Sequence, residues 1–259
     1  MLIREWMTKD VITVTPDTSM LKASKLMKDH NIRRLPVLDG KHVVGIVSDR
    51  DIRAASPSKA TTLDMHELYY LLSEVKVKDI MTSDPVTVYD TDAVDSAALL
   101  TLGEDLRGKR LIDVGTGAGF PGLPLRILEP SLQLTLLDSL GKRVNWLASV
   151  CNTLGLEGVE CLHARAEEQA LVDGYRDGFD YAVSRAVASL ELLCELCLPY
   201  LKVGGRFLAM KGVDSGEEIN HAARCISILG GRLLPSVDYV IPGANVRHRV
   251  VLVEKCTPT

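Results

Sequence analysis

The feature that most constrains this fold is an apolar strand that runs straight into a glycine-rich turn. Leu111 to Val114 form the apolar run, and Gly115, Gly117 and Gly119 alternate directly after it. Glycine tolerates positive φ and lets the main chain approach a ligand closely. The helix that follows points free N–H groups at the same place. The pattern therefore predicts a site for a nucleotide-like cofactor at this turn.

The spacing of the glycines and the acid that follows them narrow the choice of cofactor. The loop reads Gly-x-Gly-x-Gly, whereas dinucleotide-binding folds use Gly-x-Gly-x-x-Gly. Asp138 ends the next expected strand, 133–138, where a carboxylate can accept hydrogen bonds from ribose hydroxyls. We expect S-adenosylmethionine (SAM) as the cofactor, with the glycines beside its methionine part and Asp138 on its ribose.

The C-terminal part alternates strands and helices, which predicts a parallel sheet with helices on both faces. The expected strands are 110–114, 133–138, 159–163, 180–184, 205–210, 232–240 and 248–255, and the expected helices are 121–129, 141–154, 166–172, 189–201 and 215–229. The last two strands should close the sheet as an antiparallel hairpin. The fold class is α/β, with a seven-stranded Rossmann-like SAM-dependent methyltransferase domain over 93–259 and its ligand across the carboxyl ends of the strands.

Residues 1–92 carry an internal repeat, since 7–18 return as 81–92. In the first copy we expect strands at 12–14, 34–38 and 43–47 and helices near 19–30 and from 49 onward. The segments 32–37 and 45–52 resemble a cystathionine-β-synthase (CBS) domain, a module that pairs with a second copy to bind adenosine nucleotides. That resemblance implies contacts to AMP or ATP from Ser48 and Asp51. The second copy stops after its first helix, so a homodimer would have to supply the missing half of the cleft.

Five motifs follow one another in the C-terminal part, at 111–124, 136–143, 164–168, 184–186 and 210–212. In this order they closely resemble the small-subunit ribosomal RNA guanine-N7 methyltransferase family, also called glucose-inhibited division protein B, from about residue 94 onward. The resemblance implies that Gly115 and Phe120 contact SAM at the first loop, that Asp138 or Ser139 contacts its ribose, and that Ala166 and Glu167 line its adenine pocket. It places Arg185 at the methionine end or at the substrate.

The residues at the end of strand 180–184 agree with methylation of a ring nitrogen. Guanine N7 carries a lone pair and no proton, so methyl transfer needs alignment and not a general base. Ser184 and Arg185 are not the acid or amide followed by Pro-Pro-aromatic that acts on exocyclic amines, and no Pro-Cys or Thr-Cys ends a strand, which disfavours a covalent cysteine adduct. Arg185 can hydrogen-bond guanine O6 or a phosphate, and a salt bridge to the SAM carboxylate is an equal alternative.

Basic residues near the expected cofactor edge are the candidates for contacts to small-subunit ribosomal RNA. They are Lys142, Arg143, Arg165, Lys211, Arg247 and Arg249, and solvated surface charge is the alternative interpretation of each. Lys142 and Arg143 rank first, because they follow the ribose acid closely in the sequence. Phosphate contacts of this kind make RNA binding salt-dependent.

Composition excludes several other classes. No apolar run reaches the roughly 18 residues of a membrane span and no signal-peptide pattern opens the chain, so we expect a soluble, cytoplasmic protein without a membrane partner. The net charge of −4 argues against indiscriminate binding to nucleic acid. Cys194 and Cys197 lie in a helical pattern without a second cysteine pair nearby, so we expect reduced thiols and no metal site.

The N-terminal part departs from the ribosomal RNA methyltransferase pattern. Family members begin with a helical segment that contains an Asn-Leu-Thr motif and a histidine shortly before an Asp-Ser pair, whereas CBS-like sequence precedes Asp95 and Ser96 here. Because that segment helps cover the active site, we expect SAM binding to persist and turnover on RNA to fall. The alternative is a non-catalytic fusion whose CBS-like part drives dimerisation or senses a nucleotide. The two parts are joined within the helix expected at 93–102, either by a natural gene fusion or by deliberate recombination.

Overall fold

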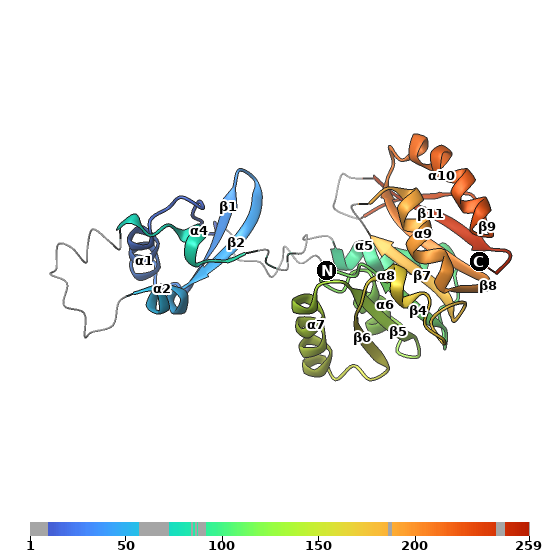
Figure 1. Ribbon diagram of the computed structural model, residues 1–259, viewed down its shortest axis with the longest axis horizontal. Helices are drawn as coiled ribbons and strands as arrows, with labels where there is room; N and C mark the ends of the chain where they lie inside the picture. Colours follow the sequence, from blue (N-terminus) through green and yellow to red (C-terminus); the bar gives the residue numbers. More distant parts are fainter. Residues whose placement is uncertain are drawn as a thin grey trace. The chain divides into compact units, whose positions relative to one another are not determined.

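A computed structural model describes residues 10–56, 73–83, 85, 87, 92–185, 188–241 and 247–258 of the chain. The chain divides into two compact units, Met7–Thr87 and a larger one that contains Val88–Thr259 (Figure 1). Among the described residues, no helix combines the length and the apolar character that a membrane crossing requires.

The smaller unit is a three-stranded antiparallel sheet with helices packed against it. Its strands, in the order β1-β2-β3, are Arg34–Asp39, His42–Ser48 and Thr82–Ser83, and its helices are α1 (Met20–Asp29), α2 (Asp49–Ala55) and α4 (Val77–Ile80). The expected strand 12–14 is reduced to a single parallel bridge between Val14 and Val37. Residue 82, at the start of the second copy of the repeat, pairs with Ile46 of β2.

Alternating apolar residues of this sheet build the core of the smaller unit. Leu35, Val37 and Val47 are fully buried, and they pack with Met20 of α1 and Val77 of α4. The side chain of Ser19 caps α1 by accepting a hydrogen bond from the Lys22 N–H. The sequence of 65–72 predicts a packing helix, and these residues lie outside the described ones.

The larger unit is organised on one mixed sheet. Its strands are β4 (Arg110–Val114), β5 (Gln133–Asp138), β6 (Val159–His163), β7 (Phe179–Arg185), β8 (Leu201–Gly212), β9 (Gly231–Leu233), β10 (Val237–Val240) and β11 (Arg247–Lys255). They lie in the order β10-β11-β8-β7-β4-β5-β6, with β9 paired to one end of β11. β4 to β8 are parallel, and β11 runs antiparallel to both β8 and β10. The expected parallel sheet and closing hairpin are confirmed, and the single strand expected at 232–240 is two short strands.

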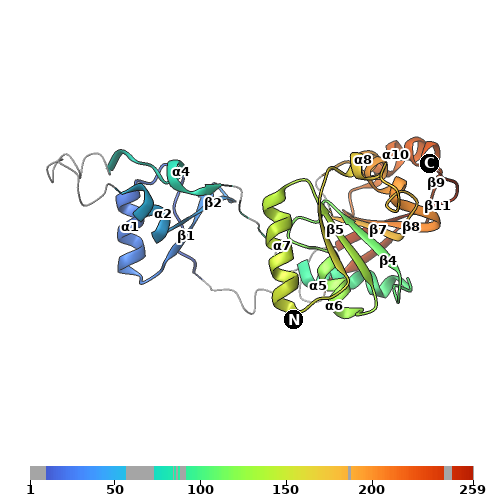
Figure 2. The same ribbon diagram turned by 60° about the horizontal axis from the view of Figure 1, so that its bottom comes forward.

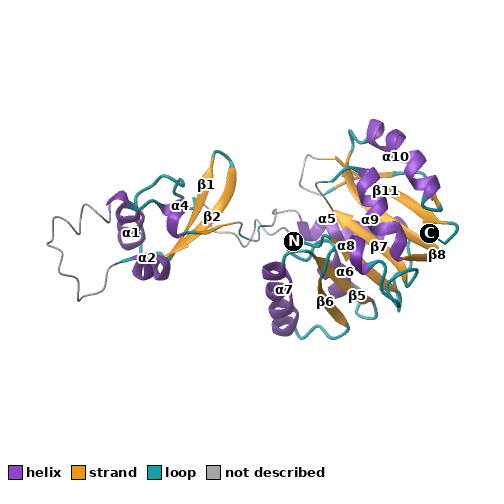
Figure 3. Ribbon diagram, in the orientation of Figure 1, coloured by secondary structure: helices purple, strands orange, loops and turns teal. Residues whose placement is uncertain are grey.

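Helices cover both faces of this sheet, as the secondary-structure colours of Figure 3 and the turned view of Figure 2 show. One face carries α5 (Asp92–Ala98), the 3₁₀ helix η2 (Leu99–Leu102), α6 (Gly122–Leu128) and α7 (Gly141–Leu154). The other carries α8 (Ala166–Gln169), α9 (Leu190–Cys197), the 3₁₀ helix η3 (Leu198–Tyr200) and α10 (Gly216–Ile228). Each face has its own buried cluster, because successive strand residues point to opposite sides.

The helix expected at 93–102 is not one regular helix. It begins at Asp92, tightens to a 3₁₀ helix at Leu99, and ends at Gly103 with a φ of 81°. Leu99 is fully buried in the cluster under α6 and α7. This segment is therefore part of the core of the larger unit.

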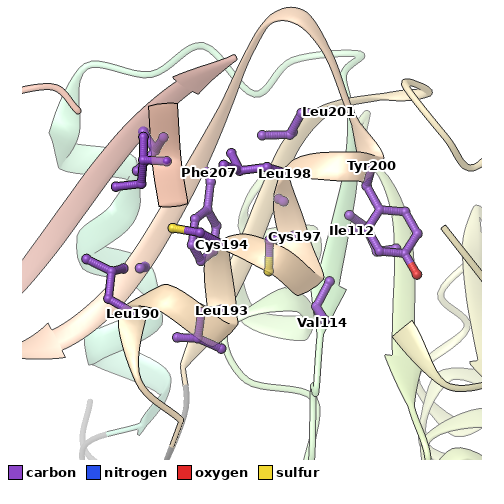
Figure 4. Packing of buried hydrophobic residues seen from close by; sticks show 14 of the residues in the cluster. Ile112, Val114, Leu190, Leu193, Cys194, Cys197, Leu198, Tyr200, Leu201 and Phe207 are labelled. Atoms are coloured by element: carbon purple, nitrogen blue, oxygen red, sulfur yellow. The ribbon is translucent and has the colours of Figure 1, made fainter. Parts of the chain in front are cut away.

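The two cysteines of α9 face the core on the other side. Cys194 and Cys197 lie between the leucines of α9 and the strand residues Ile112, Val114 and Phe207 (Figure 4). Both thiols are buried and free, and burial raises the pKa of Cys194 to about 12. These thiols are part of the packed core, which agrees with the interpretation of the sequence.

Candidate active site

The strand order places the candidate site at the boundary between β4 and β7. From β4 the chain moves outward through β5 to β6, and it then returns to β7 on the opposite side of β4. In open α/β sheets, ligands bind outside the carboxyl ends of the strands at such a reversal. The glycine loop follows β4 here, Asp138 ends β5 and Arg185 ends β7.

The main chain of the glycine loop is held by the neighbouring strand. The N–H groups of Gly115 and Thr116 both donate to the carbonyl of Leu137, over 2.9 and 3.1 Å. Gly115, Gly117 and Gly119 all have positive φ, which only glycine adopts without strain. A Cβ at either of the first two would meet nothing within 4 Å, whereas one at Gly119 would lie 2.4 Å from Leu123. The first two glycines thus border open space and the third packs against α6.

Asp113 supports the loop from beneath, and sequence reasoning missed this role. Its buried carboxylate accepts hydrogen bonds from the Thr116 hydroxyl and from the Gly122 N–H, each over 2.8 Å. Burial raises the pKa of this carboxyl to about 6, although the two hydrogen bonds act in the opposite direction. An acid inside the apolar run of β4 was the available signal, since a buried carboxyl requires partners.

Asp138 joins the glycine loop to the start of α7. One carboxylate oxygen accepts a hydrogen bond from the Gly117 N–H over 3.0 Å, and the other accepts one from the Leu140 N–H over 2.9 Å. The guanidinium of Arg143 lies 3.7 Å from the same carboxylate. The carbonyl of Ser139, the other candidate for the ribose, lies 3.1 Å from Nε2 of His163 at the end of β6.

The two residues expected at the adenine lie in the short helix α8. The Tyr200 hydroxyl donates to the carbonyl of Ala166 over 2.7 Å and so fixes the helix to η3. Glu167 is exposed, and its carboxylate pairs with Arg165 over 3.3 Å. Hydrogen bonding to its own backbone N–H, and then the bond to Arg165, lower the pKa of Glu167.

Arg185 contacts two parts of the candidate site. Its Nη1 and Nη2 donate to the two carboxylate oxygens of Asp92 in α5, with Nη2 to Oδ2 at 2.9 Å. Its guanidinium carbon lies 5.5 Å from the centre of the Phe120 ring, within the range of a cation–π contact. The neighbouring Ser184 hydroxyl is buried and donates to the carbonyl of Val114 over 2.9 Å.

A second acid of α5 connects this edge to the final hairpin. Asp95 accepts a hydrogen bond from the Tyr239 hydroxyl over 2.5 Å, and Nδ1 of His248 lies 3.5 Å from the same oxygen. The rings of Tyr239 and His248 stack with centres 5.6 Å apart. Sequence reasoning missed Asp92, Tyr239 and His248, because their contacts join segments far apart in the chain.

The basic residues expected at RNA have different surroundings. Lys142 is exposed in the first turn of α7, and Arg247 is exposed at the start of β11. Arg249 forms a bidentate pair with Asp238, with Nε to Oδ1 at 2.6 Å. Lys211 is largely buried, and its ammonium donates to the Ala188 carbonyl and to Glu218, each over 2.6 Å.

In the smaller unit, Ser48 and Asp51 bind one another. The Ser48 hydroxyl and N–H donate to Asp51 over 2.6 and 2.8 Å, and the Asp51 N–H donates back to the Ser48 hydroxyl over 3.3 Å. This is a capping box at the start of α2. Both side chains thus have a structural role beside any contact to a nucleotide.

The sheet order and the glycine loop at its reversal define an α/β methyltransferase fold, in which SAM is the cofactor. The chain belongs to the rRNA small subunit methyltransferase G family, which it matches over residues 66–240. Residues 3–58 match a CBS domain, so the fusion of the two families is confirmed. The family match begins at residue 66, upstream of residue 94, from which the sequence motifs resemble this family.

Several relatives share the name ribosomal RNA small subunit methyltransferase G. One from Alkaliphilus metalliredigens is 49% identical over 151 residues, which are 58% of this chain and 63% of that protein. One from Clostridium perfringens is 45% identical over 166 residues, 64% of this chain and 70% of that protein. One from Alkaliphilus oremlandii is 37% identical over 213 residues, 82% of this chain and 86% of that protein. The chain thus spans less than two thirds of the length of the first of these relatives.

Two solved structures share the fold. A predicted O-methyltransferase from Agrobacterium tumefaciens aligns with 64% of this chain and 81% of its own, with a TM-score of 0.52 and 18% identity. The mitomycin 7-O-methyltransferase MmcR aligns with 64% of this chain and 55% of its own, with a TM-score of 0.51 and 17% identity. At these identities the likeness concerns the fold alone.

The residues at the carboxyl edge fit SAM. Gly115 and Gly117 border open space where a Cβ would stand, as the close approach of a ligand to the main chain requires. Asp138 is held at the end of β5 with its carboxylate beside that loop. Gly115, Gly117, Asp138 and Ser139 therefore remain the candidates for contacts to the cofactor.

Proposed function

We propose that the chain transfers a methyl group from SAM to N7 of a guanine in small-subunit ribosomal RNA. Membership of the rRNA small subunit methyltransferase G family supports this activity. The observation that carries it in the structure is the pair of residues at the end of β7. The Ser184 hydroxyl is committed to the Val114 carbonyl and Arg185 is a cation, so neither is placed to remove a proton.

The protein's own contribution would be alignment. Bound SAM would supply an electrophilic methyl group, and N7 of guanine would supply the lone pair that forms the new bond, while the methyl–sulfur bond breaks with its electron pair on the sulfur. The loop 115–119 and Asp138 orient the donor, and Arg185 orients either the SAM carboxylate or the acceptor base, the latter through O6 or a phosphate. Lys142, Arg143, Arg165 and Arg247 would contact RNA phosphates, which position the substrate without reading its sequence.

The test is transfer of tritiated methyl from SAM to 16S ribosomal RNA that carries no such modification. Incorporation should map to one guanine, at which borohydride reduction followed by aniline cleaves the strand, because this treatment acts on N7-methylguanine. The rate of turnover measures whether residues 66–93, which lie within the family match, cover the site as the family's N-terminal segment does. Tight SAM binding without incorporation would favour a non-catalytic fusion, and incorporation at another atom would contradict the N7 assignment.

We further propose that the CBS-like unit binds AMP or ATP through Ser48 and Asp51 and pairs with a second copy of itself. The match to a CBS domain over residues 3–58 supports both ideas. Calorimetric titration with AMP and sedimentation of the full chain test them. A titration without heat, from a chain that sediments as a monomer, would contradict both.

A further inference from the structure

The guanidinium of Arg185 contacts two other residues of this chain, Asp92 and Phe120. Asp92 binds it in the plane through two parallel hydrogen bonds, one of them 2.9 Å long. Its guanidinium carbon lies over the Phe120 ring, 5.5 Å from the ring centre. Bidentate pairs of this kind fix orientation as well as charge, because the planar fork of arginine matches a carboxylate.

Asp92 is a rigid partner. Its side chain is only 3% exposed, and a buried carboxylate is tolerated when it is paired with a cation and hydrogen-bonded. The 3₁₀ helix that continues α5 is anchored, since Leu99 is fully buried in the core, and the buried Ser96 hydroxyl donates to the Asp92 carbonyl over 2.7 Å within α5. Asp92 therefore joins the core of the unit to the end of β7.

The second acid of α5 has a different partner. Asp95 Oδ2 lies 3.9 Å from Nη1 of Arg185, beyond hydrogen-bonding distance. Its other oxygen binds the Tyr239 hydroxyl and lies near His248. The in-plane partner of Arg185 is therefore Asp92, and Asp95 holds the final hairpin.

We propose that Asp92 is a positioning residue of the methyl-transfer site, which acts by fixing Arg185 over Phe120 at the end of the glycine loop. A long side chain that is ordered in advance loses less entropy when a ligand binds. The loop and Arg185 thereby keep one geometry for the cofactor and for the base. The role toward the base rests on the proposed function, whereas the role toward SAM does not.

A double-mutant cycle in SAM affinity tests this. The variants Asp92→Asn, Arg185→Lys and the double variant are titrated with SAM by calorimetry, as the full chain. Each single variant should bind about tenfold more weakly, and the double variant should be no weaker than the worse single variant within about twofold, because both changes break one interaction. An unchanged affinity in Asp92→Asn, or losses that multiply in the double variant, would overturn the proposal.

Two further variants separate a positioning role of Asp92 from a nonspecific effect of the substitution on the fold. Asp105→Asn is the matched control, since Asp105 also forms a bidentate pair, with Arg107, but on the surface and with Nε to Oδ1 at 2.8 Å. Its SAM affinity should equal that of the wild type. Asp92→Glu keeps the carboxylate and should recover most of the affinity that Asp92→Asn loses. If Asp92→Asn does not fold, Arg185→Lys decides, because an unchanged affinity in that folded variant contradicts the proposal.

Methyl transfer gives an independent readout. Loss of positioning should lower kcat for RNA more than it raises KM, because the chemical step depends on alignment. A rise in KM for RNA with an unchanged kcat would overturn a role of Asp92 in the reaction. A wild-type chain that binds SAM without transferring methyl contradicts the proposed function, while the SAM cycle still decides the role of Asp92.

Discussion

Oδ2 of Asp113 accepts a hydrogen bond of 2.8 Å from the Gly122 N–H, and this bond ties the first turn of α6 to β4. The same oxygen holds Thr116, so one buried carboxyl spans the glycine loop from both ends. The second oxygen, Oδ1, is buried and has no hydrogen-bond partner among the described residues. Stabilisation of the loop therefore comes with an electrostatic cost when the carboxyl is ionised.

This cost predicts a pH dependence of stability. Burial raises the pKa of Asp113 from its ordinary 3.8 to about 6, so between these values the folded state holds a proton that the unfolded chain has released. The free energy of unfolding should then fall as pH rises from about 4 to 6. Asp113→Asn removes this contribution. Between pH 4.5 and pH 7, the free energy of unfolding of the variant should rise by about 2 kcal/mol relative to that of the wild type, as measured by urea unfolding.

Asp105→Asn is the control for that measurement. Asp105 is exposed, and its hydrogen bond to the Arg107 side chain lowers its pKa, so its contribution has the opposite sign and is lost as pH falls. Because this pKa lies below the ordinary 3.8, Asp105 stays ionised between pH 4.5 and pH 7, and the wild type and Asp105→Asn should show the same decline over that range. A parallel decline in Asp113→Asn would show that another group causes it.

Gly115→Asp should abolish SAM binding. Gly115 has a φ of 71° and borders open space, so the substitution adds both backbone strain and a carboxylate where the methionine part of SAM is expected. Calorimetry should detect an affinity loss of at least about a hundredfold, roughly 2.7 kcal/mol. Gly108→Asp is the matched control, because Gly108 also has positive φ and open space, but it precedes β4. A retained affinity in Gly115→Asp would mean that the cofactor lies elsewhere.

The sequence predicted most of the fold, because local signals define its elements. The helix expected at 141–154 is α7 with the same bounds, since Gly155 ends it with a φ of 63°. The strand expected at 159–163 is β6, and the closing hairpin pairs as expected. The helix expected at 166–172 is shorter in the structure than predicted, because α8 ends at Gln169 and turns follow it.

The candidate site was predicted in its local parts and missed in its long-range ones. The glycines and Asp138 are close to a strand end in the sequence, so spacing alone brings them together. Asp92 meets Arg185 across 93 residues, and an acid in a first helical turn is usually explained by the helix dipole alone. The Ser-x-x-Asp pattern of Ser48 and Asp51 is typical of a capping box, which the structure contains. The CBS resemblance led instead to the prediction that these two residues contact a nucleotide.

Thiol reactivity should distinguish one cysteine from the other five. Cys256 is exposed, whereas burial raises the pKa of Cys161 and of Cys194 to about 12. The thiolate is the reactive form, so Ellman's reagent should modify one thiol rapidly at pH 8 in the native chain. Cys256→Ser should remove this fast phase. A fast phase that persists in Cys256→Ser would contradict the burial of at least one of the other five thiols.

Lys142 and Lys211, both candidates for RNA contacts, should differ in effect. Lys142 is exposed at the start of α7, so Lys142→Ala should lower the slope of log affinity for 16S RNA fragments against log salt by about 1. Lys211 donates to the Ala188 carbonyl and to Glu218 within the protein. Lys211→Ala leaves both acceptors without this donor, which should cost about 1–3 kcal/mol of stability.

The comparison of the two variants decides which residue faces RNA. Glu218 also accepts a hydrogen bond from the Leu190 N–H, so loss of Lys211 should loosen the start of α9 as well as the end of β8. Urea unfolding and filter binding on the same preparations give both quantities. A lowered salt slope at wild-type stability in Lys211→Ala would mean that its ammonium leaves Glu218 for a phosphate. An unchanged slope in Lys142→Ala would remove the first turn of α7 from the RNA interface.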